Sequence, residues 1–225
     1  YQSSEGSKDI FSDWMASKIN QTAKNCQTHI QQYRFDLASA EIYELVWSNF
    51  CDWYIEFCKV AIQKSDNVVQ TNSLIKNLIT NFYSILELLH PFMPFITEEL
   101  SSKLADLSKL EKSGYLVENG FNHAKASNQS NEIQLDKIIN IISALRVIRA
   151  ENQNIKNETL NLIISNDLNS DTQSIISENE GVISGIAKLG KIEFSDQVPA
   201  ESIEKTMDGY KIIIPLEGLI DPEEE

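Results

Sequence analysis

The chain has 225 residues, with 33 Asp and Glu against 19 Lys and Arg, and its formal net charge is −14 at pH 7. This charge argues against a protein that holds nucleic acid by charge alone, because non-specific affinity comes from phosphates neutralised by Lys and Arg. No apolar run reaches the roughly 18 residues that cross a membrane, and the N-terminus lacks a secretory signal pattern, so we expect a cytoplasmic protein without a membrane partner.

The N-terminal half carries four helical patterns, in which apolar residues recur every three or four positions. They cover residues 8–31, 36 to about 64, about 71 to 90, and 94 to about 108. Asp36 is the predicted cap of the second helix. One apolar face of that helix carries five aromatic residues: Tyr43, Trp47, Phe50, Tyr54 and Phe57. Helices with short connections predict an antiparallel bundle.

The stretch LLHPFMPFITEEL, residues 88–100, lies between the third and fourth patterns. Pro91 ends the third helix, because its ring removes a backbone donor and restricts the residue before it. Pro94 suits the first turn of the fourth. We predict a tight helix–helix corner that sends three apolar side chains into the core: Phe92, Met93 and Phe95.

The rest of the chain has a different character. Residues 109–130 are polar and contain two glycines, which is typical of a boundary or a functional loop. Residues 131–220 predict a small α+β unit. Its predicted elements are a helix over 133–152, a strand over 159–165, a helix over 170–190, a strand over 191–195, and a hairpin that turns at Asp208-Gly209.

Catalytic and metal-binding patterns are missing from the sequence. There is no Gly-rich phosphate loop, no GxSxG motif and no Cys–His pair in a plausible context. The three cysteines lack CxxC spacing and fall on apolar faces, so we predict small buried residues in a reducing compartment and no metal site: Cys26, Cys51 and Cys58. The chain is predicted to catalyse nothing by itself.

Two features remain for binding. The stretch VWSNFCDWYIEFCK, residues 46–59, is rich in aromatic residues, and such a helical stripe usually belongs to a core. Asp52, Trp53 and Tyr54 are adjacent, however, so they cannot all face one core, and at least one of them is expected to face solvent or a partner. Arg146 and Arg149 lie one turn apart and, with Arg34, are the only arginines. Two interpretations stay open for this pair, namely favourable placement near a helix C-terminus and contact with phosphate.

Several segments, taken in order, resemble the C-terminal region of the valyl-tRNA synthetases, which are class Ia aminoacyl-tRNA synthetases. They are residues 33–59, 88–100, 148–152 and 214–225. HPFMPFITEEL is shared with isoleucyl and leucyl relatives, whereas FCDWY followed by IRAEN and PLEGLID points to the valyl family. One departure is Ser101, where relatives commonly carry Trp, so the packing there is open to question.

This resemblance implies a mainly α fold: a helical anticodon-binding bundle followed by a small α+β subdomain with a C-terminal β-hairpin. The implied divisions are residues 1–108 for the bundle, 109–130 for a boundary loop, 131–220 for the linker subdomain and 221–225 for the start of a truncated arm. The ATP-binding signatures HIGH and KMSKS are absent, so we expect a piece of a longer enzyme. The intact enzyme would join valine to its tRNA with ATP and Mg²⁺, and this piece would need no cofactor.

The partner implied by the resemblance is the anticodon loop of valine tRNAs, whose middle and last anticodon letters are A and C. Unpaired loop bases are read by stacking on aromatic rings and by hydrogen bonds to their edges. The candidate loop contacts are Arg34, Phe50, Asp52 and Trp53, and the candidate stem contacts are Arg146 and Arg149. We expect a monomer.

Two other functions stay open at this point. The first is the anticodon domain of an isoleucyl or leucyl synthetase, against which FCDWY counts. The second is a non-catalytic helical module that docks another protein through its acidic surface. A standalone enzyme is disfavoured by the missing chemistry.

Overall fold

A computed structural model describes residues 9–108, 114–118, 129–152, 155 and 157–216. The chain divides into two compact units, Tyr1–Glu132 and Ile133–Glu225, and each is described by itself. The predicted arm at 221–225 and most of the predicted boundary loop lie outside the described residues.

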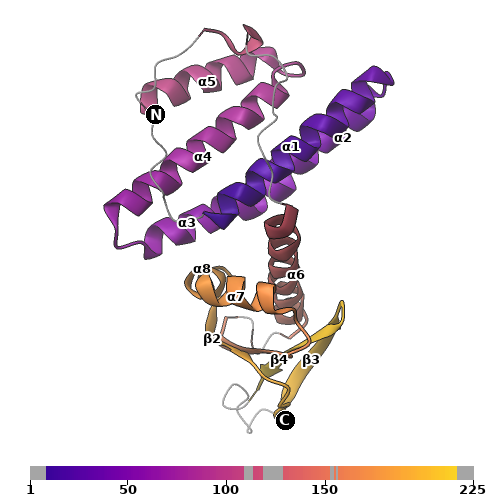
Figure 1. Ribbon diagram of the computed structural model, residues 1–225, viewed down its shortest axis with the longest axis vertical. Coiled ribbons are helices and arrows are strands. Elements are labelled where there is room, and N and C mark those ends of the chain that lie inside the picture. Colours follow the sequence, from indigo (N-terminus) through magenta and orange to yellow (C-terminus); the bar gives the residue numbers. More distant parts are fainter. Residues whose placement is uncertain (1–8, 109–113, 119–128, 153–154, 156, 217–225) are drawn as a thin grey trace. The chain divides into compact units, whose positions relative to one another are not determined.

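The first unit is helical, as predicted. Its elements are α1 (Ile10–Gln31), α2 (Phe35–Glu44), the π-helix η1 (Leu45–Tyr54), α3 (Ile55–Lys64), α4 (Val68–Leu89), α5 (Pro94–Ser108) and the short 3₁₀ turn η2 (Leu116–Glu118). In Figure 1, α1 and α2 run side by side, and α4 and α5 form a second pair. The predicted helix bundle is confirmed.

The core of this unit forms where α1 meets the helices that follow it. Asp9 caps α1 by accepting a hydrogen bond from the backbone N–H of Ser12 at 3.2 Å. Phe11 stacks on Phe57 with ring centroids 4.5 Å apart. The amide nitrogen of Asn81 donates to the Tyr54 hydroxyl at 2.9 Å. This bond fastens η1 to α4 inside the core, because a buried polar group is retained only with a partner.

The predicted helix over 36–64 is continuous, but its middle ten residues form a π-helix. A π-turn contains more residues than an α-turn, so side chains spaced by three or four positions move progressively to a different side along it. Tyr43 and Trp47 are therefore exposed, whereas the later aromatic residues Phe50, Tyr54 and Phe57 are buried. The prediction of one buried aromatic face was wrong for its first two members.

The start of α2 also differs from the prediction. The helix begins at Phe35, and the Arg34 cap makes no side-chain capping bond. The carboxylate of Asp36 instead accepts two hydrogen bonds from the Arg34 guanidinium, at 3.0 and 2.8 Å. Asp36 lies in the first turn, where its charge favours the helix N-terminus, and it is not the cap.

The corner between α4 and α5 lies where the two prolines predicted it. Phe92 packs against a cluster of three buried residues: Cys26, Ala38 and Ile42. Met93 and Phe95 do not enter the core; the Phe95 side chain is 91% exposed. The inward positions of α5 are taken by Thr97 and Ser101, four residues apart. Phe95 precedes Thr97 by two residues, about 200° around the helix, so it faces away.

The second unit contains one sheet with helices. Its elements are α6 (Gln129–Glu151), which belongs to this unit from Ile133 onward, β1 (Leu160–Ile164), α7 (Ser170–Glu178), α8 (Glu180–Ala187), β2 (Leu189–Phe194), β3 (Ser202–Met207) and β4 (Tyr210–Pro215). The strand order is β2-β1-β4-β3, with β1 parallel to β2 and antiparallel to β4. Figure 1 shows α7 and α8 beside this sheet. The predicted α+β class is confirmed.

The helix predicted over 170–190 is two helices. Its break is Asn179, whose backbone has φ −115° and ψ 18° and whose side-chain amide donates to the Ile175 carbonyl at 3.0 Å. A short polar side chain that bonds to the backbone competes with the helix, which explains the break. The predicted hairpin is confirmed: Met207 pairs with Tyr210, and Gly209 takes a φ of +91°, a region that favours glycine.

Among the described residues, no helix is long and apolar enough to span a membrane.

Candidate nucleic-acid interface

The chain reversal between α1 and α2 presents two aromatic rings and one arginine to solvent. Tyr33 takes a left-handed conformation with φ 58°, and the N–H of Arg34 donates back to the His29 carbonyl at 2.8 Å. This backbone closes α1 and starts α2 two residues later. Tyr33, Arg34 and Phe35 are all exposed.

The Arg34 guanidinium and the Asp36 carboxylate form a two-bond ion pair at the surface. The hydrogen bond from Arg34 lowers the pKa of Asp36 to about 2. An exposed pair of this kind contributes little to stability. Arg34 is accessible to a phosphate, provided that it exchanges one acidic partner for another.

A row of exposed aromatic side chains follows α2 and enters η1. The row is Phe35, Tyr43 and Trp47, and we call it the aromatic row. Tyr43 and Trp47 are four residues apart and so are neighbours on the helix surface, whereas Phe35 lies two turns before Tyr43. The rings of Tyr43 and Trp47 have centroids 6.3 Å apart and are tilted by 50°. Exposed rings in a row are suitable for stacking with flat ligands.

The three predicted loop contacts in η1, Phe50, Asp52 and Trp53, differ in how far the structure exposes them. Phe50 is 6% exposed and stacks on Phe82 with centroids 5.4 Å apart. It is a core residue, so the structure does not support its predicted contact with a ligand. Asp52 is exposed, and Trp53 is half-buried with its ring stacked on Phe57 at 6.0 Å. The expectation that one of three adjacent residues faces solvent is met by Asp52.

Arg149, a predicted stem contact, lies inside the second unit and is 8% exposed. Its guanidinium donates to four backbone carbonyl oxygens at 2.7–3.1 Å: those of Ile155, Glu158, Ala187 and Lys188. Burial lowers the pKa of this guanidinium. A guanidinium with these partners is not available to phosphate, so the structure does not support the predicted contact. Arg146, one turn earlier, is exposed.

The structure therefore gathers only part of the predicted set. Arg34, Asp52 and Trp53 remain accessible in the first unit, whereas Arg146 belongs to the second. Sequence analysis missed Tyr33 and the aromatic row as exposed groups. The tripeptide Tyr-Arg-Phe at an interruption of the helical pattern was the available signal, because a chain reversal between helices leaves few core positions.

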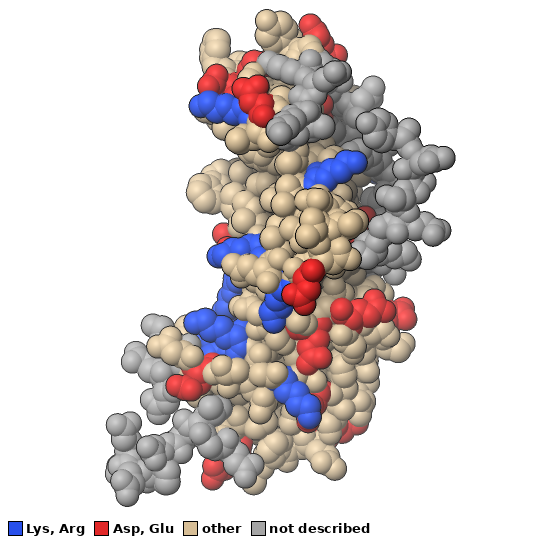
Figure 2. Space-filling view, turned by 90° about the vertical axis from the view of Figure 1, so that its left-hand side faces the viewer, with Lys and Arg blue, Asp and Glu red and all other residues tan. Residues whose placement is uncertain are grey.

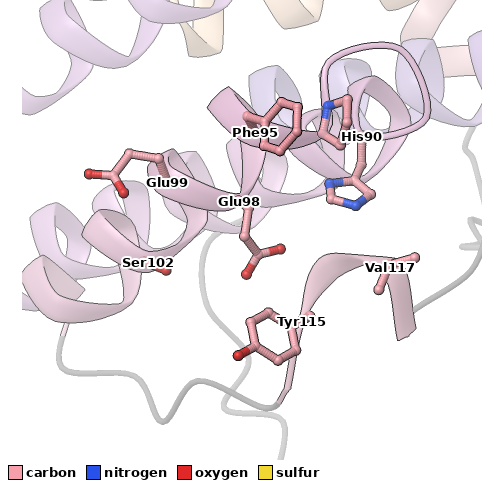
Figure 3. Close-up of a pocket in the computed structure, with 8 residues that line it drawn as sticks. His90, Phe95, Glu98, Glu99, Ser102, Tyr115 and Val117 are labelled. Atoms are coloured by element: carbon pink, nitrogen blue, oxygen red, sulfur yellow. The ribbon is translucent and has the colours of Figure 1, made fainter.

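A pocket of about 310 Å³ lies between the first turns of α5 and the turn η2 (Figure 3). It is lined by His90, Pro94, Phe95, Glu98, Glu99, Ser102, Tyr115 and Val117. Glu98 holds η2 in place, because its carboxylate accepts from the Leu116 N–H at 3.1 Å. In Figure 3 the Glu98 carboxylate points toward Tyr115 across this space.

Charges on the surface are mixed. On the face drawn in Figure 2, Lys and Arg lie close to Asp and Glu rather than in a patch of one sign. Several lysines are paired along the chain, such as Lys59 with Glu56 at 3.5 Å and Lys103 with Glu99 at 3.1 Å. The face drawn in Figure 2 therefore offers no extended positive patch to a polyanion.

The cysteines take no part in these surfaces. Cys26 and Cys58 are buried, as predicted, and Cys51 is half-buried; all three are free thiols. Burial raises the pKa of Cys26 to about 11 and that of Cys58 to about 12. Within the residues that the structure describes, no group of three or more His, Cys, Asp or Glu could hold a metal ion.

The family described as the anticodon-binding domain of tRNA ligase matches residues 12–164, which is more than half of the chain. This chain belongs to that family. The anticodon-binding domain includes all helices of the first unit from Ser12 onward, and its match extends through α6 and β1. The resemblance to aminoacyl-tRNA synthetases inferred from the sequence is confirmed.

Individual relatives of this anticodon-binding domain are valine–tRNA ligases. The ligase of Francisella tularensis is 33% identical over 218 residues, which is 94% of this chain and 23% of that ligase. The ligase of Lactobacillus acidophilus is 32% identical over 221 residues, 96% of this chain and 24% of that ligase. The ligase of Coxiella burnetii is 31% identical over 218 residues. The chain spans about a quarter of the length of these curated relatives.

Proposed function

We propose that this chain is the part of a valine–tRNA ligase that binds the anticodon loop of valine tRNAs. One observation carries the proposal: relatives that match at least 94% of the chain are valine–tRNA ligases, and the family is that of anticodon-binding domains. The same relatives disfavour an isoleucyl or leucyl ligase. An acidic docking module has no comparable support.

The aromatic row is the proposed stacking surface for the loop. Bases splayed out of an anticodon loop expose flat faces, and stacking on an aromatic ring contributes about 1–3 kcal/mol per base. Trp47 is 54% exposed and touches Tyr43, so this pair offers two adjacent rings. Stacking needs no net positive charge, which reconciles RNA binding with a net charge of −14.

Polar groups beside the row supply the remaining contacts. Arg34 would meet a backbone phosphate, because its planar guanidinium bonds two oxygens at once. The Asp52 carboxylate is exposed and would accept from the amino group of a base. The half-buried ring of Trp53 would flank that base. Arg146 remains the proposed contact to the stem. Phe50 and Arg149 are not included among the proposed contacts, because both side chains are buried.

The proposed whole enzyme would join valine to tRNA with ATP, and Mg²⁺ would supply charge neutralisation of the phosphates there. The described residues of this chain contain no cluster suited to a metal ion. Its own part of the reaction is to bind and orient the tRNA. The proposal includes a cytoplasmic location and a monomeric state.

The experiment that tests this function is a titration followed by tryptophan fluorescence at low salt. Valine tRNA is compared with the same tRNA in which the middle anticodon letter, A, is changed. We expect tighter binding of the unaltered tRNA and a change in fluorescence that Trp47→Phe reduces, because the Trp47 ring is exposed. Equal affinity for both tRNAs, or no binding, would refute anticodon recognition by this chain.

A matched pair of variants localises the contact. Tyr43→Ala removes an exposed ring of the aromatic row, and Val69→Ala removes an exposed apolar side chain from the first turn of α4. We expect Tyr43→Ala to weaken valine-tRNA binding by about fivefold or more, as loss of one stacked base predicts. Val69→Ala is expected to leave the affinity unchanged. Equal effects of the two variants would remove the aromatic row from the interface.

A further inference from the structure

The pocket between α5 and η2 has the chemistry of a site for a flat ligand with hydrogen-bond donors. We infer that it takes one unpaired nucleobase with an exocyclic amino group, that is cytosine, adenine or guanine rather than uracil. This inference rests on the proposed function, since it assigns the pocket to a second nucleotide of the bound RNA. It differs from the aromatic row in position, in lining and in the base preference that it predicts.

The residues that line the pocket include two exposed aromatic rings, Phe95 and Tyr115. Phe95 is 91% exposed, and Tyr115, on the other side, is also exposed. A ring as exposed as that of Phe95 contributes almost nothing to the core. The α5 residues that are buried in the core are Thr97 and Ser101. Both rings offer flat apolar faces for a base to stack on.

The carboxylates and His90 give the pocket mostly acceptors, while the hydroxyls of Ser102 and Tyr115 can either donate or accept. The carboxylates of Glu98 and Glu99 can only accept while ionised. The Thr97 hydroxyl has one proton, and the Met93 carbonyl 2.8 Å away can only accept it. The hydroxyl oxygen therefore accepts from Nδ1–H of His90, 2.9 Å away. In the neutral ring, Nε2 of His90 is then an acceptor, and the ring points toward the pocket (Figure 3).

This set of acceptors selects among ligands. The amino groups of cytosine, adenine and guanine donate hydrogen bonds, whereas uracil has a carbonyl where cytosine has its amino group and keeps a single N–H donor between two carbonyls. A carbonyl facing Glu98 would leave two acceptors opposed, and a phosphate would add like charge. The pocket therefore favours an amino-bearing base over uracil and over the RNA backbone.

Two contacts hold the pocket in shape before any ligand arrives. The bond from Leu116 N–H to Glu98 fixes η2 against α5, and the His90–Thr97 bond fixes the imidazole across the corner. Phe92 packs against the cluster that contains Ala38 and Ile42, which anchors this corner to α2, the helix of the aromatic row. A site formed in advance costs less ordering on binding.

The test uses short oligoribonucleotides of one base, oligo(rC), oligo(rA) and oligo(rU), with binding followed by fluorescence anisotropy. We expect the unaltered chain to bind oligo(rC) and oligo(rA) more tightly than oligo(rU). Phe95→Ala should weaken oligo(rC) binding by about fivefold or more. The control, Leu107→Ala, removes an exposed apolar side chain from the far end of the same helix and should change nothing.

A second variant separates base selection from folding. Glu98→Gln keeps an oxygen that can accept from the Leu116 N–H, and it adds an amide donor that suits the uracil carbonyl. We expect it to abolish the preference for oligo(rC) over oligo(rU) while leaving the circular dichroism spectrum unchanged. Absence of any preference in the unaltered chain, or equal effects of Phe95→Ala and Leu107→Ala, would overturn the inference.

Titrations with valine tRNA distinguish failure of the pocket assignment from failure of the proposed function. If the chain discriminates the middle anticodon letter but the pocket variants leave oligonucleotide binding unchanged, the pocket assignment fails and the proposed function stands. If the pocket variants act on oligonucleotides but no anticodon letter is discriminated, the pocket assignment stands as a base site and anticodon recognition fails.

Discussion

The guanidinium of Arg149 donates to the carbonyl oxygen of Lys188 at 2.9 Å, and this bond ties the last turn of α6 to the end of α8. Lys188 has a left-handed backbone with φ 52°, so it ends α8 with its carbonyl turned out of the helical bonding pattern. Arginine serves here because its fork of donors can satisfy several carbonyls at once.

Removal of the Arg149 side chain should destabilise the second unit. We expect Arg149→Met, which keeps an apolar stem, to lower the free energy of unfolding by roughly 1.5–3 kcal/mol, the range for hydrogen bonds to charged groups. Urea unfolding followed by circular dichroism measures it. Arg146→Met, at an exposed position one turn away, is the control and should cost less. Equal losses would contradict the role assigned to Arg149.

The Arg34–Asp36 pair gives a prediction about RNA affinity. If Arg34 meets a phosphate, Arg34→Ala should weaken binding to every tRNA alike and reduce the slope of log affinity against log salt by about one unit. Asp36→Asn should strengthen binding to every tRNA, because it releases Arg34 from its acidic partner. Titrations at several salt concentrations check both. Lost discrimination at a single anticodon letter in Arg34→Ala would mean that Arg34 contacts a base.

The buried thiols make stability depend on alkaline pH. The pKa of Cys58 is raised from 9.0 to about 12 and that of Cys26 from 9.0 to about 11. A folded-state pKa above the unfolded value gives stability that is full below the unfolded pKa and is lost as pH rises toward the folded pKa. We therefore expect the melting temperature of the unaltered chain to fall as the pH rises from 9 to 11. The melting temperature of Cys58→Ala should fall less over this range, when each protein is compared with its own melting temperature at pH 8.

Alkylation at pH 8 checks the same burial directly. Iodoacetamide should modify the half-buried Cys51 first, and Cys26 and Cys58 only after unfolding in urea. Mass spectrometry of the peptides identifies the site. Rapid modification of Cys58 in the folded chain would contradict its burial in the core.

The sequence by itself determined the elements that depend on local chemistry. Pro91 and Pro94 end and begin helices because of their fixed φ and missing donor, and Asp208-Gly209 turns a hairpin because glycine accepts a positive φ. Apolar spacing located the helices of the bundle to within a few residues. The motifs from FCDWY to IRAEN were also enough to indicate the family, which the comparisons confirm.

Only the tertiary structure decided which side chains are left for a ligand. Phe50 and Trp47 carry similar rings on one predicted face, yet the π-helix turns Phe50 toward Phe82 and leaves Trp47 in solvent. Phe95 is exposed because Thr97 and Ser101 already face the core, and Arg149 is buried because the end of α8 supplies carbonyls to it. These outcomes depend on neighbours distant in sequence, and helical periodicity reports only the helix on which a residue lies.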